Sequence, residues 1–74
     1  MQKRDRYVEA GKKLAEKKQY ARAILEFRNA VAAMPQDAES YYQLGRAYAA
    51  NREFQTAGNV LQKALELNPS TSRL

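Results

Sequence analysis

The feature that most constrains the fold of this chain is an internal repetition with a period of 34 residues. When the 74-residue sequence is displaced by that period, small, aromatic and helix-ending residues coincide, whereas polar positions differ. The coincidences therefore mark places where the backbone must pack, and they indicate one structural unit that occurs twice. The coincident pairs are Tyr7 with Tyr41, Gly11 with Gly45, Ala15 with Ala49, Ala23 with Ala57, Ala30 with Ala64 and Pro35 with Pro69.

Each repeated unit has the apolar spacing of two helices, so we expect an all-α fold of two antiparallel hairpins. The expected helices cover about residues 5–18, 20–34, 38–50 and 54–67. Pro35 ends the second helix, because proline disfavours helical backbone in the residue before it. Asp37 should cap the third helix by accepting a bond from the amide of Glu39 or Ser40. Repeat units are expected at 4–37 and 38–71, followed by a short tail at 72–74.

Several classes of function are disfavoured by what the chain lacks. The sequence contains no cysteine and no histidine. It therefore offers no disulfide, no thiolate metal site and no imidazole base. Glu9 and Glu16 share a helix face, but nothing apolar in the sequence surrounds them to raise their pKa values as acid–base catalysis would require. We expect no enzyme activity, no cofactor and no metal, and we find no apolar run long enough to span a bilayer.

Eight positions of each unit follow one order: a bulky residue, an apolar residue followed by a glycine, another bulky residue, then small, bulky, small and proline. The first unit has Tyr7, Ala10-Gly11, Leu14, Ala23, Phe27, Ala30 and Pro35, and the second has Tyr41, Leu44-Gly45, Tyr48, Ala57, Leu61, Ala64 and Pro69. This register over residues 4–71 resembles the tetratricopeptide repeat. The resemblance implies hairpins stacked as a short right-handed solenoid that binds a protein or peptide. An unrelated four-helix bundle would need no such register.

The same positions make physical sense in a helical hairpin. Gly11, Gly45, Ala23 and Ala57 lack bulk where two helices must approach closely, and the bulky residues fill the space between them. Gly58 departs from this pattern, because it lies inside the fourth helix where the first unit has Ile24. A helix-interior glycine costs about 1 kcal/mol relative to alanine. We therefore expect the fourth helix to be the weakest.

In the family that the chain resembles, the first helix of each hairpin lines a concave groove for the partner. Tyr42 follows the packing residue Tyr41, so it should turn away from the hairpin and, with Arg46 one turn on, could anchor a peptide; the alternative is that Tyr42 packs on the neighbouring repeat. The lining has an excess of acidic over basic side chains. Carried over by repeat position, it is Asp5, Val8, Glu9, Lys12, Glu16, Glu39, Tyr42, Gln43, Arg46 and Ala49.

Two further resemblances bear on the partner and the source. Some family members hold the acidic tails of heat-shock chaperones with a lysine and an asparagine, but the matching positions here are Val8 and Lys12. That departure argues against chaperone tails. The Leu-Glu-Phe-Arg-Asn-Ala segment at 25–30 resembles bacterial repeat proteins of cell-surface or exopolysaccharide export. The compartment stays open between the cytoplasm and a bacterial periplasm or cell surface, and the chain could be a fragment of a longer bacterial array.

The formal net charge of +5 leaves nucleic-acid binding as one alternative function. The excess positive charge lies mainly outside the expected groove, and a solvated helix face explains it as well. Most aromatic residues occupy packing positions and so cannot serve as platforms for stacked bases. We therefore expect only weak, salt-dependent contact with polyanions. The basic residues in question are Lys13, Lys17, Lys18, Arg22 and Arg28.

Self-association is the other alternative, because two repeats are fewer than such arrays usually need for stability. The fourth helix has Val60, Leu61, Ala64 and Leu67 at helical spacing with no following helix in this chain to cover them all. We expect these residues to form a two-fold homodimer that uses the same face twice. Exchange of the fourth helix between chains, through a straightened turn at 51–53, is a second route.

Overall fold

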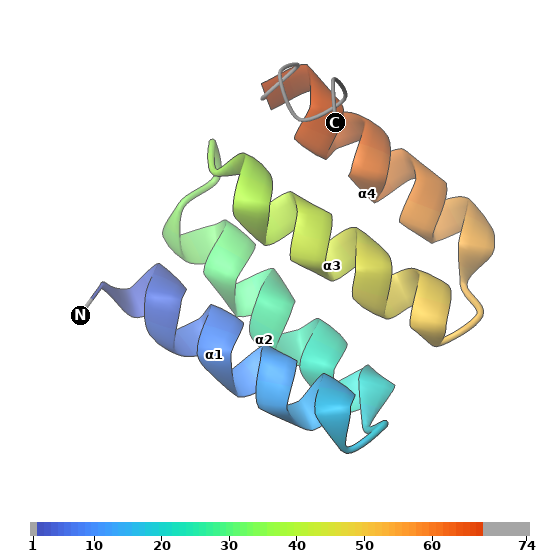
Figure 1. The fold of residues 1–74 in the computed structure, drawn as a ribbon. Helices are drawn as coiled ribbons and strands as arrows, with labels where there is room; N and C mark the ends of the chain where they lie inside the picture. Colours follow the sequence, from blue (N-terminus) through green and yellow to red (C-terminus); the bar gives the residue numbers. More distant parts are fainter. Residues whose placement is uncertain (1, 68–74) are drawn as a thin grey trace.

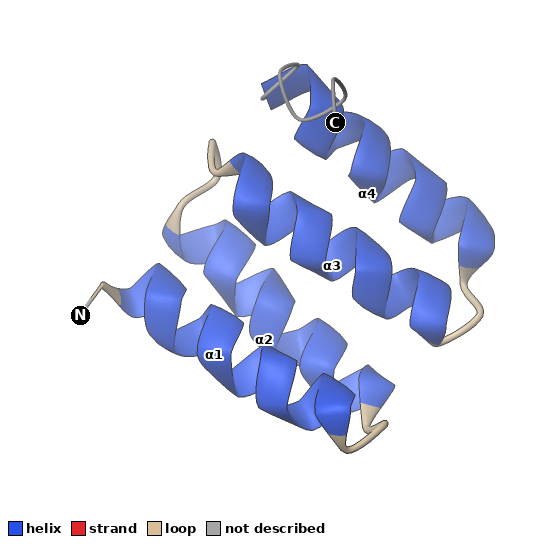
Figure 2. Ribbon diagram, viewed as in Figure 1, coloured by secondary structure: helices blue, strands red, loops and turns tan. Residues whose placement is uncertain are grey.

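The computed structural model describes residues 2–67, which form four helices joined by short loops (Figures 1 and 2). The expected all-α fold of two antiparallel hairpins is confirmed, and among residues 2–67 the structure has no strand. The residues of the expected C-terminal tail lie outside the described part. The helices are α1 (Lys3–Glu16), α2 (Tyr20–Ala33), α3 (Ala38–Ala50) and α4 (Phe54–Leu67).

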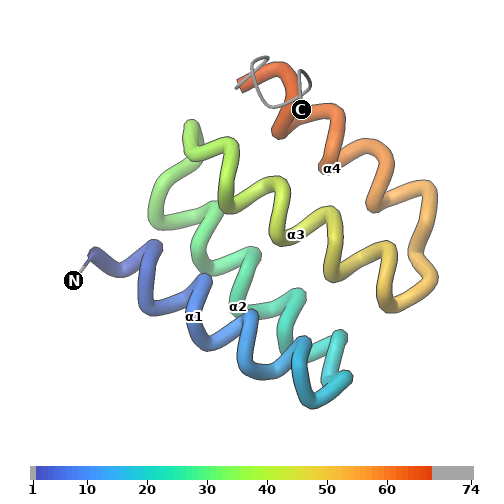
Figure 3. Tube along the Cα trace, in the orientation of Figure 1, coloured from blue at the N-terminus to red at the C-terminus, as the bar shows by residue number. Residues whose placement is uncertain are grey.

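The two hairpins are joined mainly through their second and third helices. α1 packs on α2, α3 packs on α4, and α2 packs on α3, with a smaller contact between α1 and α3. In the view of Figure 3 the paler α2 lies behind α1 and α3. Within residues 2–67, α4 contacts no helix other than α3. α2 is therefore the most enclosed helix, and α4 is the outermost.

The hydrophobic core is centred on α2. Ala23, Ile24, Phe27 and Ala30 of that helix are all buried, and Phe27 fills the largest share of the space. One residue of α1 (Val8) and two of α3 (Leu44 and Ala47) complete the buried cluster. α4 reaches this cluster only through the partly buried Val60, and its own buried residues are two alanines. α4 therefore contributes least to the hydrophobic core, and it is also the helix that the sequence predicts to be the weakest.

Two of the three glycines are required by close helix–helix contact. A Cβ atom on Gly11 would lie 2.5 Å from Cε1 of Phe27, and one on Gly45 would lie 2.6 Å from Cδ2 of Leu61. Both distances are far inside van der Waals contact, and the equivalent pairs lie at the same place in the two hairpins. Gly58 is different, because a Cβ atom there would meet nothing within 4 Å.

The first and third helices end in the same way. As a result α1 ends at Glu16, two residues before the position expected from the sequence. Lys18 adopts φ of 63° and Arg52 adopts φ of 66°. The amide of Gln19 donates to the carbonyl of Leu14, and the amide of Glu53 donates to that of Tyr48, each at 2.9 Å. These are Schellman motifs built on a left-handed residue that is not glycine.

The other helix boundaries differ little from expectation. α1 begins at Lys3 and not at 5, because the carbonyl of Gln2 already accepts a bond from the amide of Arg6. α2 ends at Ala33, one residue early, because Met34 leaves the helical conformation before Pro35. α3 and α4 have the expected bounds.

Asp37 links the start of α3 to α1. Its carboxylate accepts the expected capping bond from the Ser40 amide at 3.2 Å and a second bond from the Ser40 hydroxyl at 2.6 Å. The same Oδ2 atom lies 3.1 Å from Nε of Arg4 on α1. One carboxylate therefore satisfies a helix terminus and forms an ion pair between the two hairpins.

The glycine contacts predict opposite effects for two alanine substitutions. Gly45→Ala should lower the free energy of unfolding by about 1–3 kcal/mol, because overpacking against Leu61 outweighs the better helix propensity of alanine. Gly58→Ala should raise it by roughly 0.5–1 kcal/mol, because nothing opposes that propensity. Urea unfolding followed by circular dichroism at low protein concentration measures both. Equal effects of the two substitutions would contradict the assigned contacts.

The left-handed residues predict a second pair of stability changes. Lys18→Gly and Arg52→Gly should each stabilise the fold by about 0.5–1 kcal/mol, because glycine avoids the steric cost of positive φ. Lys17→Gly, at a neighbouring position with negative φ, is the matched control and should not stabilise. Thermal unfolding of the three variants checks this, and stabilisation by the control alone would contradict it.

Candidate functional site

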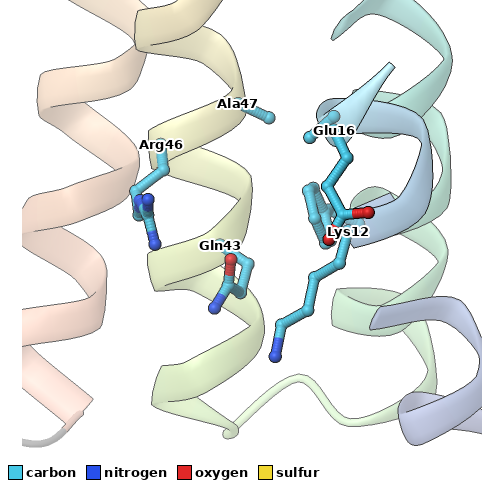
Figure 4. A pocket seen from close by; sticks show the side chains of 7 residues that line it. Lys12, Glu16, Gln43, Arg46 and Ala47 are labelled. Atoms are coloured by element: carbon cyan, nitrogen blue, oxygen red, sulfur yellow. The ribbon is translucent and has the colours of Figure 1, made fainter. Parts of the chain in front are cut away.

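A groove with a volume of about 420 Å³ separates α1 from α3. α1 contributes Lys12 and Glu16 to one wall, and α3 contributes Gln43 and Arg46 to the other. Figure 4 shows Lys12 extending into the space between the two helices, with the Gln43 side chain lying over α3 in this view. The remaining lining is apolar and comes from three helices: Ala15 of α1, Phe27 of α2 and Ala47 of α3.

A second hollow of about 780 Å³ follows α1 toward its N-terminus. Lys12 borders both hollows, so together they form a continuous track along α1. Glu39 lines the second hollow from α3 and accepts a hydrogen bond from Nε2 of Gln43 at 2.7 Å. The other lining residues are Arg4, Asp5, Arg6, Val8, Glu9, Ala10 and Lys13.

Tyr42 and Arg46 form an exposed pair on α3. The Tyr42 side chain is 43% exposed, and the guanidinium carbon of Arg46 lies 5.7 Å from the centre of its ring. This distance is that of a cation–π contact. Tyr42 therefore points away from the hairpin, as the sequence predicted, and it is not buried against the neighbouring repeat. Arg46 connects the pair to the groove, because it also forms part of the groove wall.

Most of the remaining residues expected in the groove lie along this track. Asp5, Val8 and Glu9 line the second hollow, and Lys12, Glu16 and Gln43 line the groove. Val8 differs from the others, since it is only 4% exposed and belongs to the hydrophobic core. Ala49 is half-buried and lines neither hollow. These two positions therefore offer a partner less surface than the sequence suggested.

The charge of the track differs from expectation. Among the groove residues expected from the sequence, acidic side chains outnumber basic ones. In the structure, Arg4, Arg6 and Lys13 also line the track. These cations face the second hollow because α1 presents a wider arc of its surface than repeat position alone indicates. With Lys12 and Arg46, they turn the expected acidic excess into a mixed surface of both signs.

Three residues of the groove were not among the sequence candidates: Ala15, Phe27 and Ala47. Phe27 was identified only as a packing residue, yet one part of its ring borders the groove between α1 and α3. Phe27 is only 2% exposed and Ala47 only 3%, so both form a closed floor of the groove, and Ala15 beside them is half-buried. The sequence feature that could have indicated these groove residues is a small residue on α1 and on α3 together with a large aromatic residue on α2.

The residues expected to form a self-association strip on α4 do not form an exposed strip. Ala64 is only 5% exposed, Val60 packs against the core cluster, and Leu61 meets Gly45 of α3. Leu67 is half-buried. These residues share the face that closes the second hairpin, because α4 must bury its smallest residues against α3 to approach it. The exposed apolar residues of α4 are Phe54 and Leu65.

Other kinds of site find little support in this part of the molecule. Among residues 2–67, no three histidine, cysteine, aspartate or glutamate side chains gather closely enough to hold a metal ion. Glu9 and Glu16 are both exposed on α1. In the described residues, no helix has the length and apolar character needed to cross a membrane.

Comparison with protein families identifies the architecture. The family model described as "Tetratricopeptide repeat" matches residues 14–74, which is most of the chain. The chain belongs to the tetratricopeptide repeat family. No curated protein matches it significantly. Tetratricopeptide repeats are in general non-catalytic scaffolds that mediate contacts between proteins, and their helical hairpins agree with the fold described above.

The exposure of these residues predicts which of them matter for folding. Tyr42→Ala and Arg46→Ala should each change the free energy of unfolding by less than about 0.5 kcal/mol, because both side chains are exposed. Val8→Ala should lower it by roughly 1–2 kcal/mol, because it removes buried methyl groups from the core. Chemical denaturation of the three variants measures the difference. Unfolding of the Tyr42 variant would show that this ring is a packing residue.

Proposed function

We propose that this tetratricopeptide repeat domain binds an extended peptide, or an extended segment of another protein, in the groove between α1 and α3. The observation that carries the proposal is the composition of the groove. Its floor is apolar, with half-buried Ala15 over the buried Phe27 and Ala47, and its walls carry charged and amide groups. An apolar centre within a polar rim is the usual anatomy of a site that binds protein.

The exposed Tyr42–Arg46 pair supports the same site. Tyrosine and arginine are enriched among the residues that contribute most to binding energy, because each offers a large contact area together with directional polar groups. The cation–π contact holds the two side chains together before a partner arrives. Less side-chain entropy is therefore lost when they bind.

The charges of the groove indicate the chemistry of the peptide. Lys12 and Arg46 stand on opposite walls, and Glu16 lies one turn along α1 from Lys12. A peptide with an acidic side chain near Lys12 and Arg46 and a basic side chain near Glu16 would match this arrangement. Surface charges of this kind should influence the association rate and the orientation of the peptide more than its total affinity.

Nucleic-acid binding is the weaker alternative. Lys17, Lys18, Arg22 and Arg28 are exposed but lie outside the groove lining. The track itself carries Asp5, Glu9, Glu16 and Glu39 beside its cations, so it is not a continuous basic surface. Binding of polyanions should therefore be weak and should decrease steeply as the salt concentration rises.

The experiment that tests the proposal selects peptides from a random library and measures their affinity by fluorescence anisotropy. Tyr42→Ala and Arg46→Ala should each weaken the selected peptides by about 1–3 kcal/mol. Lys17→Ala and Arg28→Ala are matched controls, because they remove exposed positive charge outside the groove. They should leave the affinity nearly unchanged.

Two results would overturn the proposal. If the control substitutions weakened binding as much as the groove substitutions, the interaction would be one of net charge and not of the groove. If a random RNA bound tightly at physiological salt and competed with the peptides, the basic surface would be the functional one.

A further inference from the structure

α4 carries an uncovered apolar stripe, defined here as Phe54, Gly58, Leu61 and Leu65. These positions are separated by four, three and four residues, so they lie within about 60° of arc on the helix. Phe54 is 68% exposed and Leu65 is 44% exposed, while Leu61 is half-buried at the border with α3. The charged residues of this helix, Lys63 and Glu66, lie outside that arc.

The repeat period shows what kind of face this is. Displacement by 34 residues places the stripe on Tyr20, Ile24, Phe27 and Val31 of α2. Ile24 and Phe27 are buried in the core cluster with Leu44 and Ala47 of α3, and Val31 packs against the same cluster. The stripe of α4 is therefore equivalent to the surface of α2 that another helix covers.

Gly58 lies in the middle of the stripe, and no contact within residues 2–67 requires a glycine there. A Cβ atom there would meet nothing within 4 Å, although glycine inside a helix costs about 1 kcal/mol relative to alanine. At Gly11 and Gly45 the missing side chain makes room for Phe27 and Leu61. By the same physics, Gly58 leaves room for a large side chain that the described residues do not supply.

A head-to-tail stack of copies does not fit this face. In such a stack α1 of one copy would cover α4 of the next, as α3 covers α2. The buried contact positions of α3 are Ser40, Leu44 and Ala47. Their equivalents on α1 include the exposed cations Arg6 and Lys13. Covering the stripe with α1 would bury two unpaired charges against apolar side chains, which is strongly unfavourable.

We propose that α4 forms a two-fold homodimer with α4 of a second copy, in antiparallel orientation. The stripe is symmetric about the point between Asn59 and Val60. An axis at that point brings Phe54 opposite Leu65 of the second copy, and Gly58 opposite Leu61 of the second copy. Each glycine then leaves room for the exposed part of Leu61 of the second copy, while the inner part of that side chain packs on Gly45 of its own hairpin. Apolar groups face apolar groups throughout, and no charge is buried.

A single helix face is small for a protein interface. Specific stable complexes usually bury about 800 Å² on each partner, and one helix offers less, so the dimer should dissociate at a concentration of roughly 100 µM. The stripe and the groove between α1 and α3 share no residue, because α4 contributes nothing to the groove lining. Failure of this proposal would therefore leave the proposed peptide binding untouched.

Sedimentation equilibrium over a range of protein concentrations tests the dimer. Phe54→Ser and Leu65→Ser should each weaken dimerisation at least tenfold. Leu25→Ser is the matched control, because Leu25 is 59% exposed on α2 and lies outside the stripe. Gly58→Gln separates association from folding: it should stabilise the isolated fold through helix propensity and yet weaken the dimer at least tenfold by filling the space for Leu61 of the second copy.

Paired cysteines test the antiparallel register, since the natural chain has none. The double variant Phe54→Cys with Leu65→Cys should oxidise to a covalent dimer, whereas either single variant should cross-link far less. The two positions are eleven residues apart on one helix, about 16 Å, which is too far for a disulfide within a chain. Efficient cross-linking of the single variants would indicate a parallel dimer and overturn the register.

Three other outcomes would overturn the proposal itself. A monomer at millimolar concentration would assign the stripe to a further helix or to a different partner. A dimer that is insensitive to the stripe substitutions would indicate exchange of α4 between chains, which leaves the stripe exposed. Equal weakening by Leu25→Ser would indicate non-specific association.

Discussion

The structure depends on the close approach of two helices in each hairpin at a glycine. Gly11 receives the ring of Phe27, and Gly45 receives the side chain of Leu61. Any larger residue at either glycine would push the helices apart, because protein interiors are packed at crystal-like density and have no room to spare. The two contacts are equivalent under the 34-residue period, so they give the two hairpins the same geometry. Because the hairpins have the same geometry, successive hairpins can stack through the same kind of contact, as they do in repeat proteins.

The groove between α1 and α3 is a consequence of this stacking. The ring of Phe27 that fills the space at Gly11 also borders the groove, so one side chain serves both the core and the site. Asp37 holds the two sides of the groove in place, since it caps α3 and pairs with Arg4 of α1. The groove walls are helices fixed by packing and not loops, which suits a site that binds without a large rearrangement.

The two ends of the array differ because the repeats have diverged at the positions that join them. The stacking face of α3 carries Leu44 and Ala47, whereas the equivalent face of α1 carries Ala10 and Lys13. α1 therefore presents charge to solvent. At the other end, Ile24 of α2 is replaced by Gly58 in α4, and large apolar residues beside it stay exposed. α1 therefore carries charged side chains at positions where α3 carries packing residues, and α4 keeps Phe54 and Leu65 exposed.

The sequence by itself determined the helices, the hairpins and the family, because the 34-residue register and the packing glycines are local patterns that a single repeat must satisfy. It also identified Asp37 as a cap and Tyr42 as a side chain that points outward. Only the tertiary structure decided which side chains stay accessible. Ala64 lies against α3 although helical spacing placed it in an exposed strip, and Val8 lies in the core although its repeat position placed it in the groove lining. The end of α1 at Glu16 was also hidden, because a lysine with positive φ, such as Lys18, has no sequence signature. Spacing along a helix defines a face, but the neighbouring helices determine how much of that face remains in contact with water.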